Sequence, residues 1–288
     1  MINYNPKNWL NFIFSFHKSD TVRMMWKELV YISLLSVIIA YIEITFFPEA
    51  SFLKNLTTVY SLLGFVISLL LVFRTNTAYD RWWEGRKAWG SIVNDTRSLS
   101  SKLSAASLTI EEKNSFTRLI PLFVVATKQH LRNQDLKQEA SVVLYLDGLD
   151  LSGHQPLRII QLLRVEIENL LHKETIHKES WLALNRDLDS LINSLGVCER
   201  IKNTPIPFSY SLFIKKFIFI YVVTMPLAFV PLFGYLSAFI STFVFYALVS
   251  MELLAEEIED PFGSDQNDLP TDQLCLTIQN NCQQIFGA

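Results

Sequence analysis

Three long apolar runs limit what this chain of 288 residues can fold into. Residues 29–47 contain one charged side chain, Glu43, and residues 56–73 contain none. A bilayer core requires about 20 apolar helical residues, with about 17 as the lower limit. Each of these two runs is therefore long enough for one membrane-spanning helix.

The third run, residues 217–251, is also free of charged side chains. It is too long for one span and sufficient for two short ones. Pro226, Pro231 and Gly234 lie near its middle, where a tight hairpin or a broken helix is expected. We predict four spans, at about residues 29–47, 55–73, 215–233 and 235–252.

Glu43 is the exception within the first span. The apolar residues around it favour insertion by roughly 4–7 kcal/mol on the translocon scale, which exceeds the cost of one carboxylate. Glu43 is within one turn of the end of the run and is expected to reach water. An interfacial carboxylate is the first interpretation, and a role at an ion entrance is the alternative.

The basic residues predict how the spans are oriented. Four of them precede the first span, namely Lys7, Lys18, Arg23 and Lys27. Lys54 lies between the first two spans, and the remaining lysines and arginines fall between residues 74 and 216. The positive-inside rule then places both termini and this central segment in the cytoplasm. Residues 1–28 lack the apolar core of a cleaved signal peptide.

Five segments follow from this pattern. We expect a cytosolic N-terminal segment (1–28), two spans (29–73), a cytosolic helical domain (74–214), two further spans (215–252) and a cytosolic C-terminal segment (253–288). The central domain is predicted to be helical, with a capping box of Thr109 and Glu112 before a helix over 110–134. Amphipathic helices are expected over 157–171 and 181–195, after a loop at 145–156. The fold class is all-α.

Several functional classes are disfavoured. A net charge of -3 argues against a nucleic-acid partner, which requires a basic face. The three cysteines and five histidines show no metal-ligand spacing, so we predict neither a metal site nor a cofactor. The sequence also lacks the zinc-protease, nucleophile-elbow and P-loop motifs, which argues against an enzyme.

Three segments carry distinctive motifs. Residues 74–90 read RTNTAYDRWWEGRKAWG, and residues 198–216 read CERIKNTPIPFSYSLFIKK. Residues 252–270 read ELLAEEIEDPFGSDQNDLP. Aromatic and basic residues at the end of a span are typical of an interfacial belt. Ion pairs that join helices or subunits are the alternative. The residues proposed as this subunit interface or inner-leaflet anchor are Arg74, Asp80, Arg81, Trp82, Trp83 and Glu84.

Taken together, the three motifs closely resemble the bacterial branch of the bestrophin family, from about residue 20 to the C-terminus. The resemblance implies a homopentamer in the inner membrane, whose central pore is lined by the second span of each subunit. It also implies a neck of three apolar rings, at Leu62, Val66 and Leu70. These positions lie on one helical face, although periodicity alone does not choose that face over Phe65, Ser68 and Leu69. A second constriction at the cytosolic exit is expected near Ile176 to Glu179.

The chain departs from the family pattern in two places. Animal relatives have aromatic neck rings, whereas these three residues are aliphatic. Animal relatives also carry a dense acidic run that builds a calcium clasp, whereas only Asp265 and Asp268 remain between residues 264 and 268. Calcium gating is therefore not expected.

The predicted function is passive conduction of small monovalent ions, chloride or sodium. A membrane transporter and a non-conducting scaffold are the alternatives. The family as a whole favours chloride, while the acidic C-terminal segment favours cations, so the selectivity stays open at this point. The second span has no charged residue from Leu56 to Phe73, which suits a pore gated by apolar rings.

Overall fold

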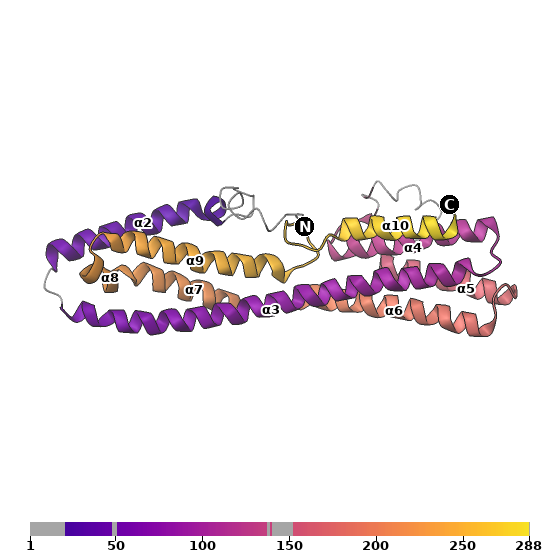
Figure 1. The fold of residues 1–288 in the computed structure, drawn as a ribbon, viewed down its shortest axis with the longest axis horizontal. Helices are drawn as coiled ribbons and strands as arrows, with labels where there is room; N and C mark the ends of the chain where they lie inside the picture. The colour runs from indigo at the N-terminus through magenta and orange to yellow at the C-terminus, as the bar shows by residue number, and fades with distance from the viewer. Residues whose placement is uncertain (1–20, 48–50, 137–138, 140–151, 288) are drawn as a thin grey trace. The chain divides into compact units, whose positions relative to one another are not determined.

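The computed structural model describes residues 21–47, 51–136, 139 and 152–287. These residues divide into two compact units, each treated by itself. One unit, here called the membrane unit, comprises Ile2–Asp80 and Pro205–Glu259. The other, here called the bundle unit, comprises Arg81–Thr204 and Asp260–Ala288. All the regular secondary structure in the described ranges is helical (Figure 1), which confirms the all-α prediction.

The membrane unit contains α2 (Thr21–Phe46), the first part of α3 (Ser51–Ser104), α7 (Phe208–Thr224), α8 (Pro226–Phe233) and α9 (Leu236–Glu259). Four segments are long and apolar enough to cross a membrane: α2, α3, α7 with α8, and α9. The third is interrupted at Met225 before Pro226, because proline cannot continue the hydrogen-bond ladder. Gly234, at φ 53°, then turns the chain toward α9.

The membrane unit packs around its own apolar core, which includes Ile67, Leu71, Ile218, Val222 and Phe245. A close approach of α3 and α7 is possible because residue 64 is glycine. A Cβ atom at Gly64 would come within 2.8 Å of the Tyr221 hydroxyl. That hydroxyl donates a hydrogen bond to the carbonyl oxygen of Tyr60 at 3.2 Å, which fixes how these two helices meet.

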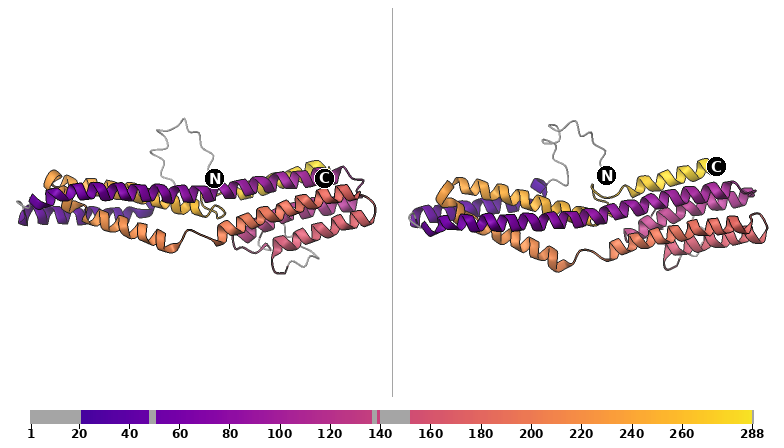
Figure 2. Two further views of the ribbon diagram at one scale, coloured as in Figure 1. Left: turned by 90° about the horizontal axis from the view of Figure 1, so that it is seen from below. Right: turned by 60° about the horizontal axis from the view of Figure 1, so that its bottom comes forward.

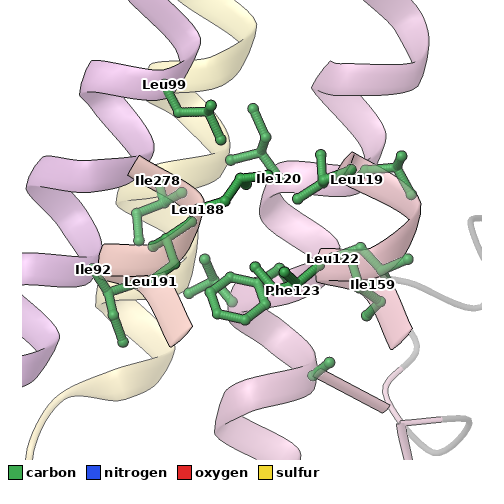
Figure 3. Close-up of a cluster of buried hydrophobic side chains, with 14 of the residues drawn as sticks. Ile92, Leu99, Leu119, Ile120, Leu122, Phe123, Ile159, Leu188, Leu191 and Ile278 are labelled. Atoms are coloured by element: carbon green, nitrogen blue, oxygen red, sulfur yellow. The ribbon is translucent and has the colours of Figure 1, made fainter. Parts of the chain in front are cut away.

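The bundle unit contains the rest of α3, α4 (Ile110–Leu131), α5 (Gln155–His172), α6 (Lys178–Asn203) and α10 (Thr271–Phe286). The pairs α4–α5, α5–α6 and α4–α10 are in contact, and α4, α5 and α6 run side by side in both views of Figure 2. Figure 3 shows their shared core, to which α3 contributes Ile92 and Leu99, and α4 contributes Ile120 and Phe123. Among the described residues, α4, α5, α6 and α10 are not segments long and apolar enough to cross a membrane.

Several local predictions can be compared with these helices. The capping box of Thr109 and Glu112 is confirmed, and α4 begins directly after it. The helix that contains the first predicted span extends beyond it, because α2 begins at Thr21 rather than near residue 29. The predicted loop at 145–156 ends earlier, since Gln155 already begins α5, and residues 145–151 lie outside the described residues. The same is true of residues 1–20 of the predicted N-terminal segment.

Glu43 differs from its predicted environment. Its side chain is only 6% exposed, and its Oε2 atom has no hydrogen-bond partner among the described residues. Although the residue is within one turn of the end of α2, it faces the helices of its own subunit rather than water. The prediction that it reaches water is therefore wrong for the single subunit.

Candidate ion pathway and helix-end contacts

The three predicted neck residues lie in the N-terminal, apolar part of α3. Leu62 and Val66 are exposed in the subunit, and Leu70 is half-buried. A neighbouring face of the helix, about 100° away, is buried through Ile67 and Leu71, which pack against the unit's own core. The competing positions, Phe65, Ser68 and Leu69, are also exposed, so exposure alone does not separate the two faces.

The membrane half of α3 is the least covered of the four apolar segments. Only 11% of its most apolar stretch is buried within the subunit, against 22%, 39% and 28% for the other three. A helix this apolar must be covered by lipid or by other subunits, for example by the same helix of neighbouring subunits arranged around an axis. This uncovered surface makes α3 the strongest candidate for contacts between subunits.

Arg74 directly follows the apolar part of α3 and forms a buried ion pair. Its side chain is 1% exposed, and its Nη2 atom donates to Glu259 Oε2 at 2.7 Å. The second oxygen of Glu259 accepts the backbone N–H of Ile206 at 2.7 Å. One carboxylate therefore ties α3 to the end of α9 and to the segment before α7. The Nε and Nη1 atoms of Arg74 have no partner among the described residues.

Further along α3, three of the proposed interface residues contact their own subunit. Arg81 donates from Nη1 and Nη2 to the carbonyl oxygens of Thr204 and Ile201, both at 2.5 Å. These carbonyls end α6, where backbone acceptors lack helical partners. Trp82 Nε1 donates to Asn267 O at 3.0 Å, and Glu84 accepts from Arg200 at 2.5 Å. Much of this motif thus orders one subunit from within.

Asp80 and Trp83 differ from these neighbours in being exposed on the subunit surface. A large exposed aromatic side chain at the end of an apolar segment suits either a lipid headgroup layer or a neighbouring subunit. The prediction of a subunit interface in this motif therefore depends on these two side chains, and it stays a prediction.

The predicted cytosolic exit lies in the turn between α5 and α6. Ile176 is 6% exposed and belongs to the core of the bundle unit. Glu179, in the first turn of α6, is exposed. In the single subunit, only Glu179 of this pair reaches the surface, so a constriction formed by Ile176 would need that side chain to leave its own core.

A pocket of about 410 Å³ lies between α2, α7 and α9 of the membrane unit. Its wall is apolar through Ile32, Ile218 and Phe245, with Glu28 and Lys215 among its lining residues. None of the residues that line it comes from α3. It is therefore separate from the neck positions.

One polar cluster was missed by the sequence analysis. His130, His154 and Glu199 offer ligand atoms that all lie within 4.8 Å of one another. They come from the end of α4, the residue before α5 and the body of α6. The sequence contains no local spacing that relates them, so only the packing of these helices could reveal the group.

Comparison with known proteins agrees with this architecture. The sequence pattern of the family described as "Bacterial/Fungal Bestrophin protein" matches residues 1–284. A relative from Synechocystis, named voltage-dependent anion channel-forming protein sll1024, is 38% identical over 229 residues, which are 77% of this chain and 75% of the relative. The Escherichia coli protein named voltage-dependent anion channel-forming protein YneE is 30% identical over 290 residues, covering 99% of this chain and 94% of that protein.

Solved structures show the same fold. A crystal structure of a mutant bestrophin homolog from Klebsiella pneumoniae superimposes with a TM-score of 0.81 and 29% sequence identity. The superposition covers 92% of this chain and 100% of that chain. Because the family pattern extends over nearly the whole sequence and the fold agrees, this membrane protein belongs to the bacterial and fungal bestrophin family.

Proposed function

We propose that this protein is an anion channel that assembles as a homopentamer and conducts small monovalent ions, chloride above all, passively across the inner membrane. The uncovered apolar half of α3 is the observation that carries the proposal. A single such helix cannot enclose a conduit, so a ring of subunits is required. Five subunits follow from the resemblance to bestrophins, and the names of the relatives support an anion as the permeating ion.

In this arrangement Leu62, Val66 and Leu70 form three stacked collars around the axis. Narrow apolar collars lose water readily, and an ion that passes them sheds part of its hydration shell. The collars therefore act as the gate, while the charges at the two mouths set selectivity. Both termini and the bundle unit lie in the cytoplasm, as the distribution of lysine and arginine predicts.

The experiment is a bilayer recording of the purified protein with a potassium chloride gradient across the membrane. An anion channel gives a reversal potential close to the chloride equilibrium potential. A reversal potential close to that of potassium would make the pore cation-selective. Absence of current would favour the scaffold, and flux that requires a second, coupled solute would favour the transporter.

The assembly state is tested separately, by native mass spectrometry in mild detergent. The expected species is a pentamer that retains bound lipid. A stable monomer or dimer under conditions that preserve bilayer currents would contradict the ring of α3 helices.

A further inference from the structure

The bundle unit contains a compact cluster of two imidazoles and one carboxylate. Nε2 of His130 is 2.8 Å from Oε1 of Glu199, and Nε2 of His154 is 2.6 Å from the same oxygen. The two imidazole rings are 4.4 Å apart between centroids. The three side chains are 27–35% exposed, so the cluster is accessible to solvent on one side.

The hydrogen bonds indicate which protons are present. His154 precedes α5, and its Nδ1 atom accepts the backbone N–H of Leu157 at 3.3 Å. Its Nε2 atom then carries the ring proton and donates it to Glu199. His130 directs its Nε2 atom at the same carboxylate oxygen. The cluster therefore offers two imidazole nitrogens and one carboxylate oxygen as ligand atoms.

We propose that His130, His154 and Glu199 form a binding site for a divalent transition metal of the zinc class. Zinc accepts imidazole and carboxylate ligands at about 2.0–2.2 Å, so tetrahedral donor atoms are separated by roughly 3.3 Å. The two nitrogen–oxygen separations are those of hydrogen bonds, and each has to lengthen by roughly half an ångström to admit the ion. The exposed side leaves a fourth position for water.

The surroundings set the strength of binding and the choice of metal. Lys202 donates to the carbonyl oxygen of His130 at 2.8 Å, so its positive charge lies near the site and weakens the binding of any cation. The two imidazoles favour zinc, cobalt or nickel over magnesium and calcium, which prefer oxygen ligands. Binding through Nε2 of His154 also moves its ring proton to Nδ1, which ends the long cap hydrogen bond to Leu157.

The bound metal connects three helices of one unit. His130 is in the last turn of α4, His154 is the residue before α5, and Glu199 is in the last part of α6. A metal that binds only the folded unit stabilises it. The site thus couples the availability of a transition metal to the rigidity of the bundle unit, independently of what the pore conducts.

The experiment is isothermal titration calorimetry of zinc chloride into the metal-free, full-length protein in detergent. We expect one zinc per subunit. His154→Asn, which retains a good helix N-cap, and Glu199→Gln should each weaken binding by more than about tenfold. His177→Ala is the matched control, because His177 is exposed and makes no side-chain cap. Calcium should not bind at this site.

A spectroscopic measurement on the unmodified protein avoids reliance on variants. Cobalt(II) bound to two nitrogen ligands and one carboxylate in tetrahedral geometry gives intense visible absorption bands that octahedral cobalt in water lacks. We expect these bands to appear at one equivalent and to disappear when zinc is added. Absence of the bands, or equal zinc uptake by the wild type and His154→Asn, would overturn the proposal.

Discussion

The carboxylate of Glu259 illustrates how much can depend on one charged residue at a membrane boundary. The guanidinium of Arg74 is buried, and Glu259 is its ion-pair partner at 2.7 Å. Glu259→Gln should destabilise the protein by about 3–5 kcal/mol, because it leaves a buried cation uncompensated. Thermal or denaturant unfolding in detergent measures this change.

Glu256→Gln provides the matched control. Glu256 pairs with Lys215 at 2.8 Å, but about half of each side chain is exposed. Exposed pairs contribute about 0–1 kcal/mol, so this variant should unfold almost as the wild type does. An equal loss of stability in the two variants would mean that burial does not set the strength of the ion pair between Arg74 and Glu259.

Asp268 gives the bundle unit a pH-dependent stability. Burial raises the pKa of its carboxyl group from 3.8 to about 6, and Oδ2 accepts the N–H of Asp265 at 2.6 Å. The folded state thus binds a proton more tightly than the unfolded state, and stability falls as pH rises from about 4 through 6. Asp268→Asn should raise the melting temperature above pH 6, with the gain vanishing near pH 4.

Asp272 should show the opposite sign. Hydrogen bonds from Arg132 and Lys128 lower the pKa of its carboxyl group from 3.8 to about 2. Its contribution to stability is present above about pH 4 and is lost as pH falls toward 2. Asp272→Asn should therefore lower the melting temperature at pH 7 by a modest amount, since the carboxylate is largely exposed. A gain in stability at pH 7 would contradict the assigned pairing.

At the scale of the element, Arg81, which is a residue of α3, caps the C-terminal end of α6 with its side chain. Its two hydrogen bonds satisfy the carbonyl oxygens of Ile201 and Thr204, which have no helical partner of their own. Arg81→Ala should cost about 1.5–3 kcal/mol and increase hydrogen exchange in the last turn of α6. Subunit association should be little affected, because these contacts lie within one chain.

Trp83→Ala tests the other half of the motif. Trp83 is 47% exposed, so truncation should destabilise a single subunit less than the loss of a fully buried tryptophan would. A loss of pentamer in native mass spectra would place this side chain at a subunit interface. A normal pentamer with weaker partitioning into lipid would place it in the interfacial belt.

The elements themselves were partly predictable from sequence. The apolar runs coincide with the four helical segments that are long and apolar enough to cross a membrane, because hydropathy reports the thickness of a bilayer. They did not locate where α2 begins, because a helix can continue past the bilayer through polar residues such as those after Thr21. Thr109 was recognised because a capping box is a local pattern of side chains and backbone.

The site was less predictable, because its contacts join residues that are distant in sequence. Arg74 and Glu259 are 185 residues apart, and His154 and Glu199 are 45 apart. A periodic pattern can propose the face of a helix, but it cannot name the partner that another helix supplies. The motif at residues 74–90 was therefore recognised as important while the contacts of Arg81 and Trp82 were not.

At the scale of the whole assembly, the neck hypothesis depends on which face of α3 surrounds the axis. Val66→Ala with Leu70→Ala should widen and wet the apolar collars, which raises single-channel current and lowers selectivity. Stability should fall only slightly, since Val66 is exposed and Leu70 is half-buried in the subunit. Single-channel recording in planar bilayers measures the change.

Ile67→Ala on the same helix is the control that separates a wider pore from a weaker protein. Ile67 is 1% exposed and packs in the core of the membrane unit, so its truncation should cost about 2–5 kcal/mol. It should leave the current of each intact channel unchanged, because the side chain is buried in the core of its own unit rather than exposed with Val66. If instead the double variant conducts as the wild type does, the face of Phe65 and Leu69 becomes the one that lines the pore, and the collars have to be sought there.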